Sequence, residues 1–186
     1  QDQRQYEING SNNRFALNPE IDTIQSAFPT PKPGGIMIDT NILSQFSLFN
    51  ELPENLLKEI AAISKEISAK QGDFVFREGE KADKLHFLLN GSIALRVKLT
   101  SRPDSVTVSF VSSPFQSFGW SGVVPPYHYT SSAECEEDSN LLIIPSEPFM
   151  KLLEQNPESG FKVMQRITVI IADRLRNSRQ ALLKTI

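Results

Sequence analysis

Glycines divide the middle of the chain into apolar runs that are too short to form helices. Gly72, Gly79 and Gly91 separate runs at 74–76, 85–89 and 92–97, and similar runs follow at 106–111, 131–135 and 141–144. Many short strands with turn residues between them favour a barrel or a sandwich over a parallel sheet. The chain also holds 12 phenylalanines, whose rings suit a half-buried pleated surface. We therefore expect a mainly β core.

Helical patterns flank these predicted strands. Before them, with Pro53 in the first turn, apolar residues recur at three- and four-residue intervals at Leu52, Leu56, Leu57, Ile60 and Ile63. This spacing predicts a short amphipathic helix. After the strands, Ser146 precedes Glu147 and Pro148, which predicts a second helix that is capped by the serine.

A long helix is predicted at the C-terminal end, over residues 157–186. The segment begins with Pro157, and Gly160 is its one later helix-weakening residue. Between Ile167 and Leu175 its apolar residues cover more than one face. One face can therefore pack on the domain while another is available to a second copy, so we expect a homodimer through this helix.

Residues 1–40 differ in composition from the rest of the chain. They are polar and contain Pro29, Pro31 and Pro33, followed by two glycines. Such a segment offers little apolar surface to offset the entropy of ordering, so it is predicted to be an extended polar arm. We expect one domain over residues 41–186, with the arm held by contact with another chain or a neighbouring surface.

Composition argues against several functional classes. The net charge of −3 disfavours general binding to nucleic acids or anionic membranes, and no apolar run approaches the roughly 20 residues that span a bilayer. Cys135 is the only cysteine, and His86 and His128 are the only histidines, so we expect no metal site and no haem. No nucleophile–base pair, P-loop or secretory leader is visible, which predicts a non-catalytic, cytoplasmic protein.

One stretch carries a specific pattern. Residues 72–95 include the Arg77-Glu78-Gly79-Glu80 turn between two further glycines, each followed by an apolar run. This stretch resembles the first half of the cyclic nucleotide-binding domain of the Crp/Fnr superfamily. Phe118-Gly119, residues 131–133 and residues 141–144 resemble the family's phosphate-binding cassette and the strand that follows it. The resemblance covers about residues 41–186.

The resemblance implies both a fold and a ligand site. The family fold is mainly β with flanking α-helices: a β-roll of eight strands, of the jelly-roll or double-stranded β-helix type, followed by a long C-terminal helix. In the cassette, a short helix presents backbone N–H groups to the cyclic phosphate. The family also places a glutamate directly after Phe-Gly, to bind the ribose 2′-hydroxyl, and an arginine before the Ser/Ala/Thr run, to pair with the phosphate.

This sequence departs from the family at both charged positions. Trp120 stands at the glutamate position and Tyr129 at the arginine position. Each lost charge-assisted hydrogen bond costs on the order of 1.5–3 kcal/mol, so we expect negligible cyclic nucleotide binding at micromolar levels and no other cofactor. Residues 118–130 also resemble a single-domain subgroup with a Phe-Gly-Trp-Ser cassette, in which an arginine stands where this chain has His128.

The candidate ligand-binding residues are those of this degenerate cassette: Phe118, Gly119, Trp120, Ser121, Gly122, Val123, His128, Tyr129, Thr130, Ser131 and Ser132. Trp120 and Tyr129 either form an aromatic pocket for a planar or hydrophobic effector or fill the vacated nucleotide site as core. Gly119 and Gly122 permit a tight backbone, which leaves a weak phosphate or carboxylate site as a further expectation.

Other polar residues have a structural interpretation beside a functional one. His128 is either a pH-dependent anion contact or an exposed loop residue, and His86 is expected to point outward from its strand or to be hydrogen-bonded. Cys135 is either a redox switch or a small buried hydrophobic residue. The acidic run at 134–138 is expected to be a solvated loop rather than a cation site.

The basic residues of the predicted C-terminal helix are attributed to the helix dipole: Arg174, Arg176, Arg179 and Lys184. We prefer this interpretation to a nucleic-acid patch because the sequence leaves no room after Ile186 for a helix-turn-helix, and we expect no DNA-binding domain.

Two functions from different classes remain open. The favoured hypothesis is a stand-alone sensor or regulatory module that transmits a signal through its long helix. The alternative is a structural or interaction subunit that docks into a larger assembly through residues 1–40.

Overall fold

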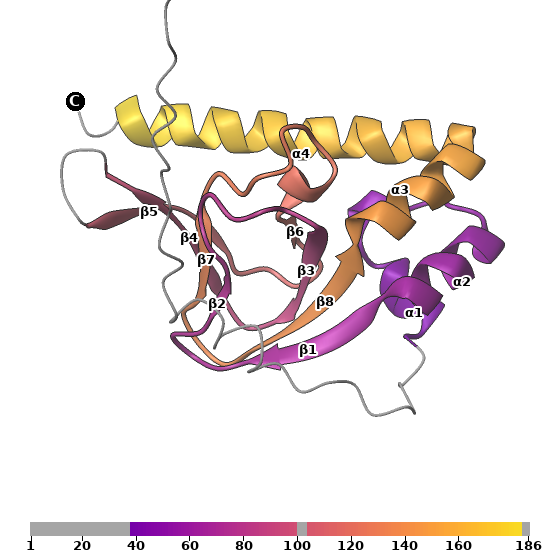
Figure 1. Ribbon diagram of the computed structural model, residues 1–186, viewed down its shortest axis with the longest axis horizontal. Coiled ribbons are helices and arrows are strands. Elements are labelled where there is room, and N and C mark those ends of the chain that lie inside the picture. Colours follow the sequence, from indigo (N-terminus) through magenta and orange to yellow (C-terminus); the bar gives the residue numbers. More distant parts are fainter. Residues whose placement is uncertain (1–37, 100–103, 184–186) are drawn as a thin grey trace, which may run out of the picture. The chain divides into compact units, whose positions relative to one another are not determined.

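The computed structural model of the chain describes residues 38–99 and 104–183. Eight strands in these residues form two four-stranded sheets, and helices precede and follow them (Figure 1). The predicted β-roll with flanking helices and a long C-terminal helix is thus confirmed. The predicted N-terminal arm lies outside the described residues except for Ile38, Asp39 and Thr40, of which Ile38 is buried.

Both sheets are antiparallel throughout. The first sheet has the order β1 (Lys65–Ala69), β8 (Ser139–Pro145), β3 (Lys84–Asn90) and β6 (Ser117–Phe118). The second has the order β2 (Phe74–Phe76), β7 (Ser132–Cys135), β4 (Ile93–Lys98) and β5 (Ser105–Val111). The predicted strands are all present, whereas β1 and β6 were not predicted, because neither carries an apolar run.

Helices flank the strands of the roll on both sides in the chain. The helices α1 (Thr40–Leu43), η1 (Ser47–Phe49, a 3₁₀ turn) and α2 (Glu54–Ile63) precede the strands, and α3 (Ser146–Gln155) and α4 (Pro157–Leu183) follow them.

The prediction that Ser146 caps a helix was wrong. Strand β8 runs directly into α3, so Pro145 takes the cap position, and the buried Ser146 Oγ has no hydrogen-bond partner among the described residues.

Apolar side chains form two cores. The first lies inside the roll and includes Phe76, Phe118 and the buried Cys135. The second lies between the first sheet and the helices, where the rings of four phenylalanines have centroids 4.8–6.1 Å apart, at Phe46, Phe49, Phe87 and Phe149. Such ring pairs add stability beyond the area that they bury.

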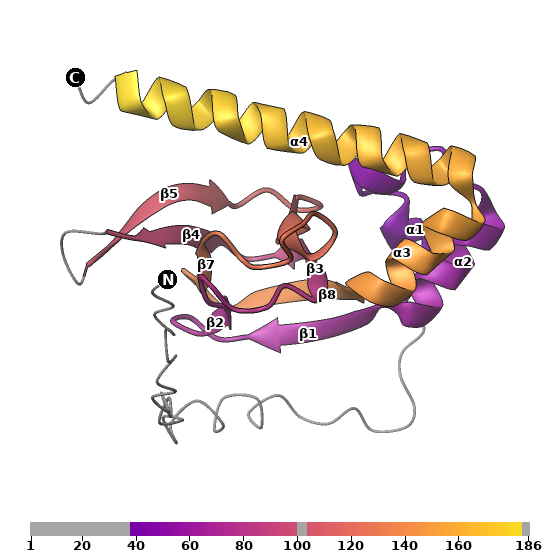
Figure 2. The same cartoon turned by 45° about the horizontal axis from the view of Figure 1, so that its top comes forward.

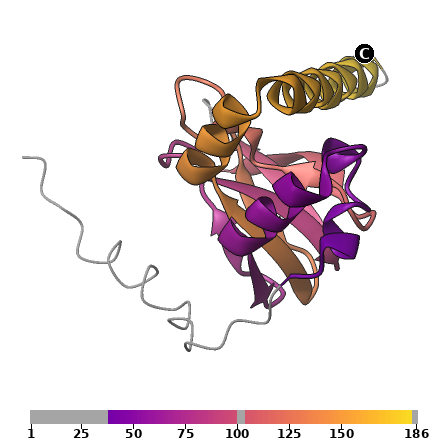
Figure 3. The ribbon, with the colours of Figure 1, turned by 90° about the vertical axis from the view of Figure 1, so that its right-hand side faces the viewer.

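Helix α4 joins the second core near its N-terminal end. Val163 and Ile167 are buried there, and Arg166 donates hydrogen bonds to the carbonyls of Leu48 and Asn50. Figure 2 shows that α4 continues past this core and runs alongside the roll, with β5 beneath its C-terminal half, and Figure 3 looks almost along its axis. No helix in the described ranges is both long enough and apolar enough to cross a membrane.

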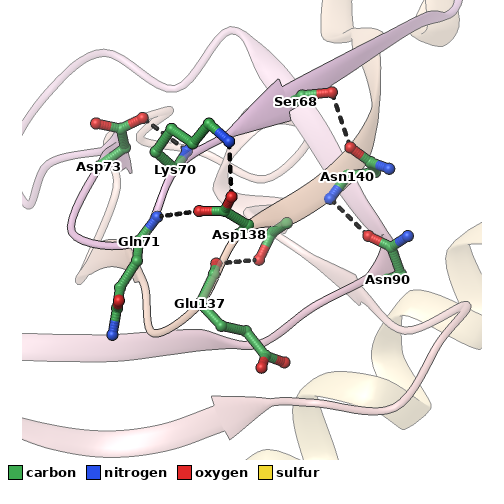
Figure 4. Close-up of polar contacts among 9 residues, drawn as sticks. Ser68, Lys70, Gln71, Asp73, Asn90, Glu137, Asp138 and Asn140 are labelled. Carbon is green, nitrogen blue, oxygen red and sulfur yellow. Dashed lines mark hydrogen bonds and ion pairs between the residues drawn. The ribbon is translucent and has the colours of Figure 1, made fainter.

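Polar contacts join the end of β1 to the start of β8 (Figure 4). Lys70 Nζ donates to a carboxylate oxygen of Asp138 at 2.6 Å, and the Gln71 backbone N–H donates to the other oxygen at 3.0 Å. These bonds lower the pKa of Asp138 and raise that of Lys70. Both groups are exposed, so the pair fixes the local geometry more than it stabilises the fold.

The acidic run matches its prediction only in part. Glu137 and Asp138 are exposed as expected. Glu134, however, lies in β7, and Arg96 of the neighbouring strand places its Nε 2.8 Å from Glu134 and a terminal nitrogen 3.2 Å from Glu136. The run therefore supplies partners for a strand arginine, and no cluster of His, Cys, Asp or Glu that could hold a metal ion occurs in the described residues.

Gly91 provides a test of the close packing in the roll. Its φ is +97°, and a Cβ there would lie 2.7 Å from the Ser139 Cα and 2.2 Å from the Ser139 Oγ. Gly91→Ala adds this clash to the cost of a left-handed alanine, so the free energy of unfolding should fall by about 2–4 kcal/mol. Gly72→Ala is the matched control, because Gly72 has φ +85° and open space around it, and it should lose only about 1–2 kcal/mol. Equal losses in chemical denaturation would contradict the packing described.

Candidate functional site

The predicted cassette connects β6 to β7 and begins with a tight turn. Gly119 has φ +71°, in the left-handed region, and the 3₁₀ turn η2 (Trp120–Gly122) follows it. The Gly122 and Val123 amides donate within this turn, to the carbonyls of Gly119 and Trp120. An alanine at Gly122 would place its Cβ 2.8 Å from the backbone oxygen of Lys84 and 2.4 Å from the Ser146 Oγ, so only glycine fits this close approach to β3 and α3.

Tyr129 occupies the core at the far end of the cassette. Its ring stacks on Phe76 with centroids 3.8 Å apart and planes 11° apart, and its hydroxyl donates to the Lys84 carbonyl at 3.2 Å. Burial, with the nearby charge of Asp83, raises the pKa of this phenol well above its usual value. The residue at the family's arginine position is thus a neutral, buried ring.

His86 lies beneath the cassette, not on the outside of the roll. The side chain is buried, its ring lies 5.1 Å from that of Phe76 and 5.3 Å from that of Phe118, and its Nδ1 has no hydrogen-bond partner among the described residues. The prediction of an outward or hydrogen-bonded histidine was therefore wrong. The His86 ring packs directly against Gly119, since a Cβ at position 119 would lie 2.8 Å from the His86 Nδ1.

A pocket of about 270 Å³ lies between the cassette, the strands β4 and β5, and helix α4. Apolar side chains form much of its wall, at Phe76, Leu95, Val97, Val108, Ile171 and Leu175. Hydroxyl groups also line it, at Ser109, Ser121, Thr130, Ser131 and Ser178. This volume is just below the range of about 300–1,000 Å³ that is common for ligand pockets, which suits a small ligand.

The structure brings six of the predicted site residues to this pocket: Gly119, Trp120, Ser121, Tyr129, Thr130 and Ser131. The other five lie elsewhere. Phe118, Gly122 and Val123 are buried, and the Ser132 Oγ accepts a hydrogen bond from the Glu78 amide. His128 is exposed, and its Nδ1 lies 2.9 Å from the carbonyl of Pro126 in its own loop.

The sequence analysis missed the residues that α4 contributes. Arg174 lines the pocket, with its guanidinium carbon 4.3 Å from the centroid of a Trp120 ring and an N–H donating to the Ser117 carbonyl at 2.9 Å. Burial lowers the pKa of this guanidinium to about 10, so it is still protonated at neutral pH. Arg174 also lies before the last turn of α4, which ends at Leu183, so assigning it to the helix dipole was wrong.

The comparisons with known proteins agree with this geometry. The family model of the cyclic nucleotide-binding domain matches residues 66–156. A solved structure from Geobacter metallireducens, described as that of a candidate cyclic nucleotide-binding protein, is 33% identical with a TM-score of 0.66, and the alignment covers 75% of this chain and 99% of that one. The chain belongs to the cyclic nucleotide-binding domain family.

More distant structures share the fold of this cyclic nucleotide-binding domain. The sensor domain of the transcriptional regulator DNR from Pseudomonas aeruginosa is 18% identical with a TM-score of 0.63, covering 74% of this chain and 91% of that one. The catabolite activator protein of Thermus thermophilus is 21% identical with a TM-score of 0.60, covering 73% of this chain and 61% of that one. A search of curated proteins finds no match.

Buried His86 gives a prediction about pH. Burial, and to a smaller extent the charge of Lys84, lowers the pKa of His86 from 6.5 to about 3. Between these values the unfolded chain binds a proton that the folded protein does not, so this part of the stability is complete above pH 6.5 and is lost as the pH falls. We expect His86 alone to contribute a slope approaching about 1.4 kcal/mol per pH unit in that window.

Two variants isolate this contribution. His86→Phe, which suits the aromatic surroundings, should show a weaker fall of the unfolding free energy between neutral and acidic pH than the wild-type protein. His128→Gln changes the exposed histidine and should keep the wild-type slope. Urea denaturation at a series of pH values makes the comparison, and identical slopes in the wild type and His86→Phe would rule out the assignment.

Proposed function

We propose that this chain is a non-catalytic regulatory module of the cyclic nucleotide-binding fold whose pocket no longer binds cyclic nucleotides tightly. The observation that carries the proposal is the place of Tyr129, which stands at the family's arginine position and is buried against Phe76. No guanidinium from the cassette is then available for a cyclic phosphate. Trp120, at the position of the ribose-binding glutamate, places an indole where the family has a carboxylate.

The chemistry of the lining supports a binding role over a catalytic one. Among the described residues that line the pocket, the ionisable side chains are those of Tyr129 and Arg174. Neither is suited to proton transfer at neutral pH, because burial raises the pKa of Tyr129 and leaves that of Arg174 at about 10. The related folds named above, a sensor domain of a transcriptional regulator and a catabolite activator protein, are regulatory.

Helix α4 is the proposed output of the module. It touches the pocket through Ile171, Arg174 and Leu175, and it also presents apolar surface, since Val169 is 58% exposed and Leu175 is 53% exposed. We propose that this surface forms a homodimer, so that a change at the pocket reaches the partner copy through the same helix.

Two finer assignments belong to the same proposal, and one alternative function stands beside it. The Phe118-Gly119-Trp120-Ser121 string supports membership of the single-domain subgroup with this cassette, and we propose a cytoplasmic location. The alternative function, a structural subunit that docks on a larger assembly through residues 1–40, concerns residues that lie mostly outside the described ranges. Protection of this arm from protease only in the presence of a partner would support that alternative.

The proposal predicts negligible binding of cyclic AMP and cyclic GMP. Isothermal titration calorimetry on the purified chain should give dissociation constants well above about 10 µM for both nucleotides. The melting temperature should likewise not rise, whereas a ligand at a hundred times its dissociation constant would add about 2.7 kcal/mol. A dissociation constant at or below about 10 µM for either nucleotide would show that the cassette still recognises it.

The dimer is tested by charges on α4. Val169→Glu combined with Leu175→Glu should give a monomer in analytical ultracentrifugation, because burying two carboxylates in an apolar contact is strongly unfavourable. Phe161→Glu is the control, since Phe161 is 65% exposed on the same helix but outside the segment 167–175. A wild-type protein that sediments as a monomer at tens of micromolar would refute the dimer.

A further inference from the structure

The pocket contains a positive charge without a negative partner. Arg174 is the one charged residue among the described residues that line it. No carboxylate of the described residues lies within 4.0 Å of its nitrogens; it donates a hydrogen bond to the Ser117 carbonyl and lies over the Trp120 ring. Taking a charge out of water is costly unless an opposite charge or further hydrogen bonds compensate it. An anion in the pocket would supply that compensation.

The surroundings of Arg174 restrict the shape of such an anion. The Trp120 ring lies on one side of the guanidinium at 4.3 Å. Apolar side chains of β4, β5 and α4, including Leu95, Val108 and Ile171, form the wall beyond it, and the other polar side chains of the lining are those of Tyr129 and of serine and threonine residues. A ligand that fits has a small anionic head for Arg174 and a flat, apolar body for the rest.

We infer that this pocket binds a small planar carboxylate, with the Arg174 guanidinium as its counter-ion and the Trp120 ring and apolar wall around its body. The inference rests on the proposed function, because it names the ligand class of the same pocket. Arg174 is then the residue that determines specificity for an anion, in place of the family's cassette arginine.

A carboxylate fits this site better than a phosphate monoester does. A phosphate carries nearly two charges at neutral pH, and the described lining offers one cation to meet them. A carboxylate carries one charge, and its two oxygens match the fork of a guanidinium. The pocket volume of about 270 Å³ leaves space for an aromatic body of one or two rings.

Binding at Arg174 also connects the cassette to α4. The guanidinium belongs to α4, whereas its ring partner Trp120 belongs to η2 and its hydrogen-bond acceptor Ser117 to β6. A planar carboxylate that pairs with Arg174 gives the guanidinium a new partner beside the Ser117 carbonyl and places its flat body against residues of both the cassette and α4. The ligand would therefore change the contacts that hold the C-terminal half of α4 against the roll.

The test uses the full chain and three probes: 2-naphthoate, its uncharged analogue 2-naphthamide, and inorganic phosphate. Calorimetry should detect 2-naphthoate binding, with the amide about tenfold weaker or worse and no binding of phosphate at about 1 mM. Equal affinity for the carboxylate and the amide, no carboxylate binding at about 1 mM, or tighter binding of phosphate would each overturn the inference.

Variants on α4 assign the effect to one side chain. Arg174→Gln should weaken 2-naphthoate binding about tenfold or more without affecting the amide. Arg176→Gln is the matched control, because Arg176 is exposed on the same helix and pairs with Asp173 at 2.6 Å, and it should bind 2-naphthoate as the wild type does. An unchanged affinity in Arg174→Gln would overturn the assignment.

The test remains decisive if one variant fails to fold, and it separates this inference from the proposed function. If Arg174→Gln does not fold, the comparison of carboxylate and amide on the wild-type protein still decides the inference, and Arg174→Lys provides a variant that keeps the charge. Failure of the carboxylate leaves the proposed function intact, whereas tight cyclic AMP binding overturns the proposed function whatever the naphthoate result.

Discussion

The stack of Tyr129 on Phe76 joins three parts of the molecule: the second sheet, the cassette and the first sheet. Phe76 belongs to β2 of the second sheet, Tyr129 closes the cassette, and the Tyr129 hydroxyl reaches the carbonyl of Lys84 at the start of β3 in the first sheet. The backbone of Tyr129 also bonds to Glu80 and Gly79, in the turn that follows β2. Removing a buried ring of this kind typically costs about 3–5 kcal/mol. The side chain that replaces the family's arginine is therefore a major structural element of this protein.

Helix α4 is fixed at two places that differ in character. Its N-terminal half has buried apolar residues, Val163 and Ile167, and the bonds from Arg166 to η1. Farther along, the contacts are those of the pocket wall and of Arg174. The apolar contacts of the first half are the more costly to break, since each fully buried large side chain contributes roughly 1.5–3 kcal/mol. The second half is held partly by a charged group whose removal from water costs free energy, so it is the more easily displaced half and the one that a ligand can influence.

The sequence specifies much of this fold through local patterns. Short apolar runs, the first three of them separated by turn glycines, predict six of the strands, and the lack of breakers after Gly160 predicts α4. β1 is missed because its side chains are mostly exposed or half-buried, with Ala69 alone buried, so it lacks an apolar run. The expectation that His86 points outward fails because β3 is covered on both faces. Leu85 and Phe87 meet the helices, whereas His86 and Leu88 face the inside of the roll.

The cassette was recognisable from its string of residues, but the pocket was not. Trp120 and Tyr129 could be located by their positions relative to Phe118-Gly119 and the Ser131-Ser132 pair. Arg174 could not, because helical spacing shows that Ile171, Arg174, Leu175 and Ser178 share a face without showing what that face covers. Only the path of α4 over the cassette makes Arg174 a pocket residue.

Trp120 has one more consequence, because it is the only tryptophan in the chain. Light that only indole absorbs therefore excites a single side chain, which lies in the pocket wall under the guanidinium of Arg174. The fluorescence of an indole depends on its exposure to water and on charges beside its ring. Whatever enters the pocket or shifts α4 alters both at once, so the unlabelled protein carries an optical reporter of its own binding site.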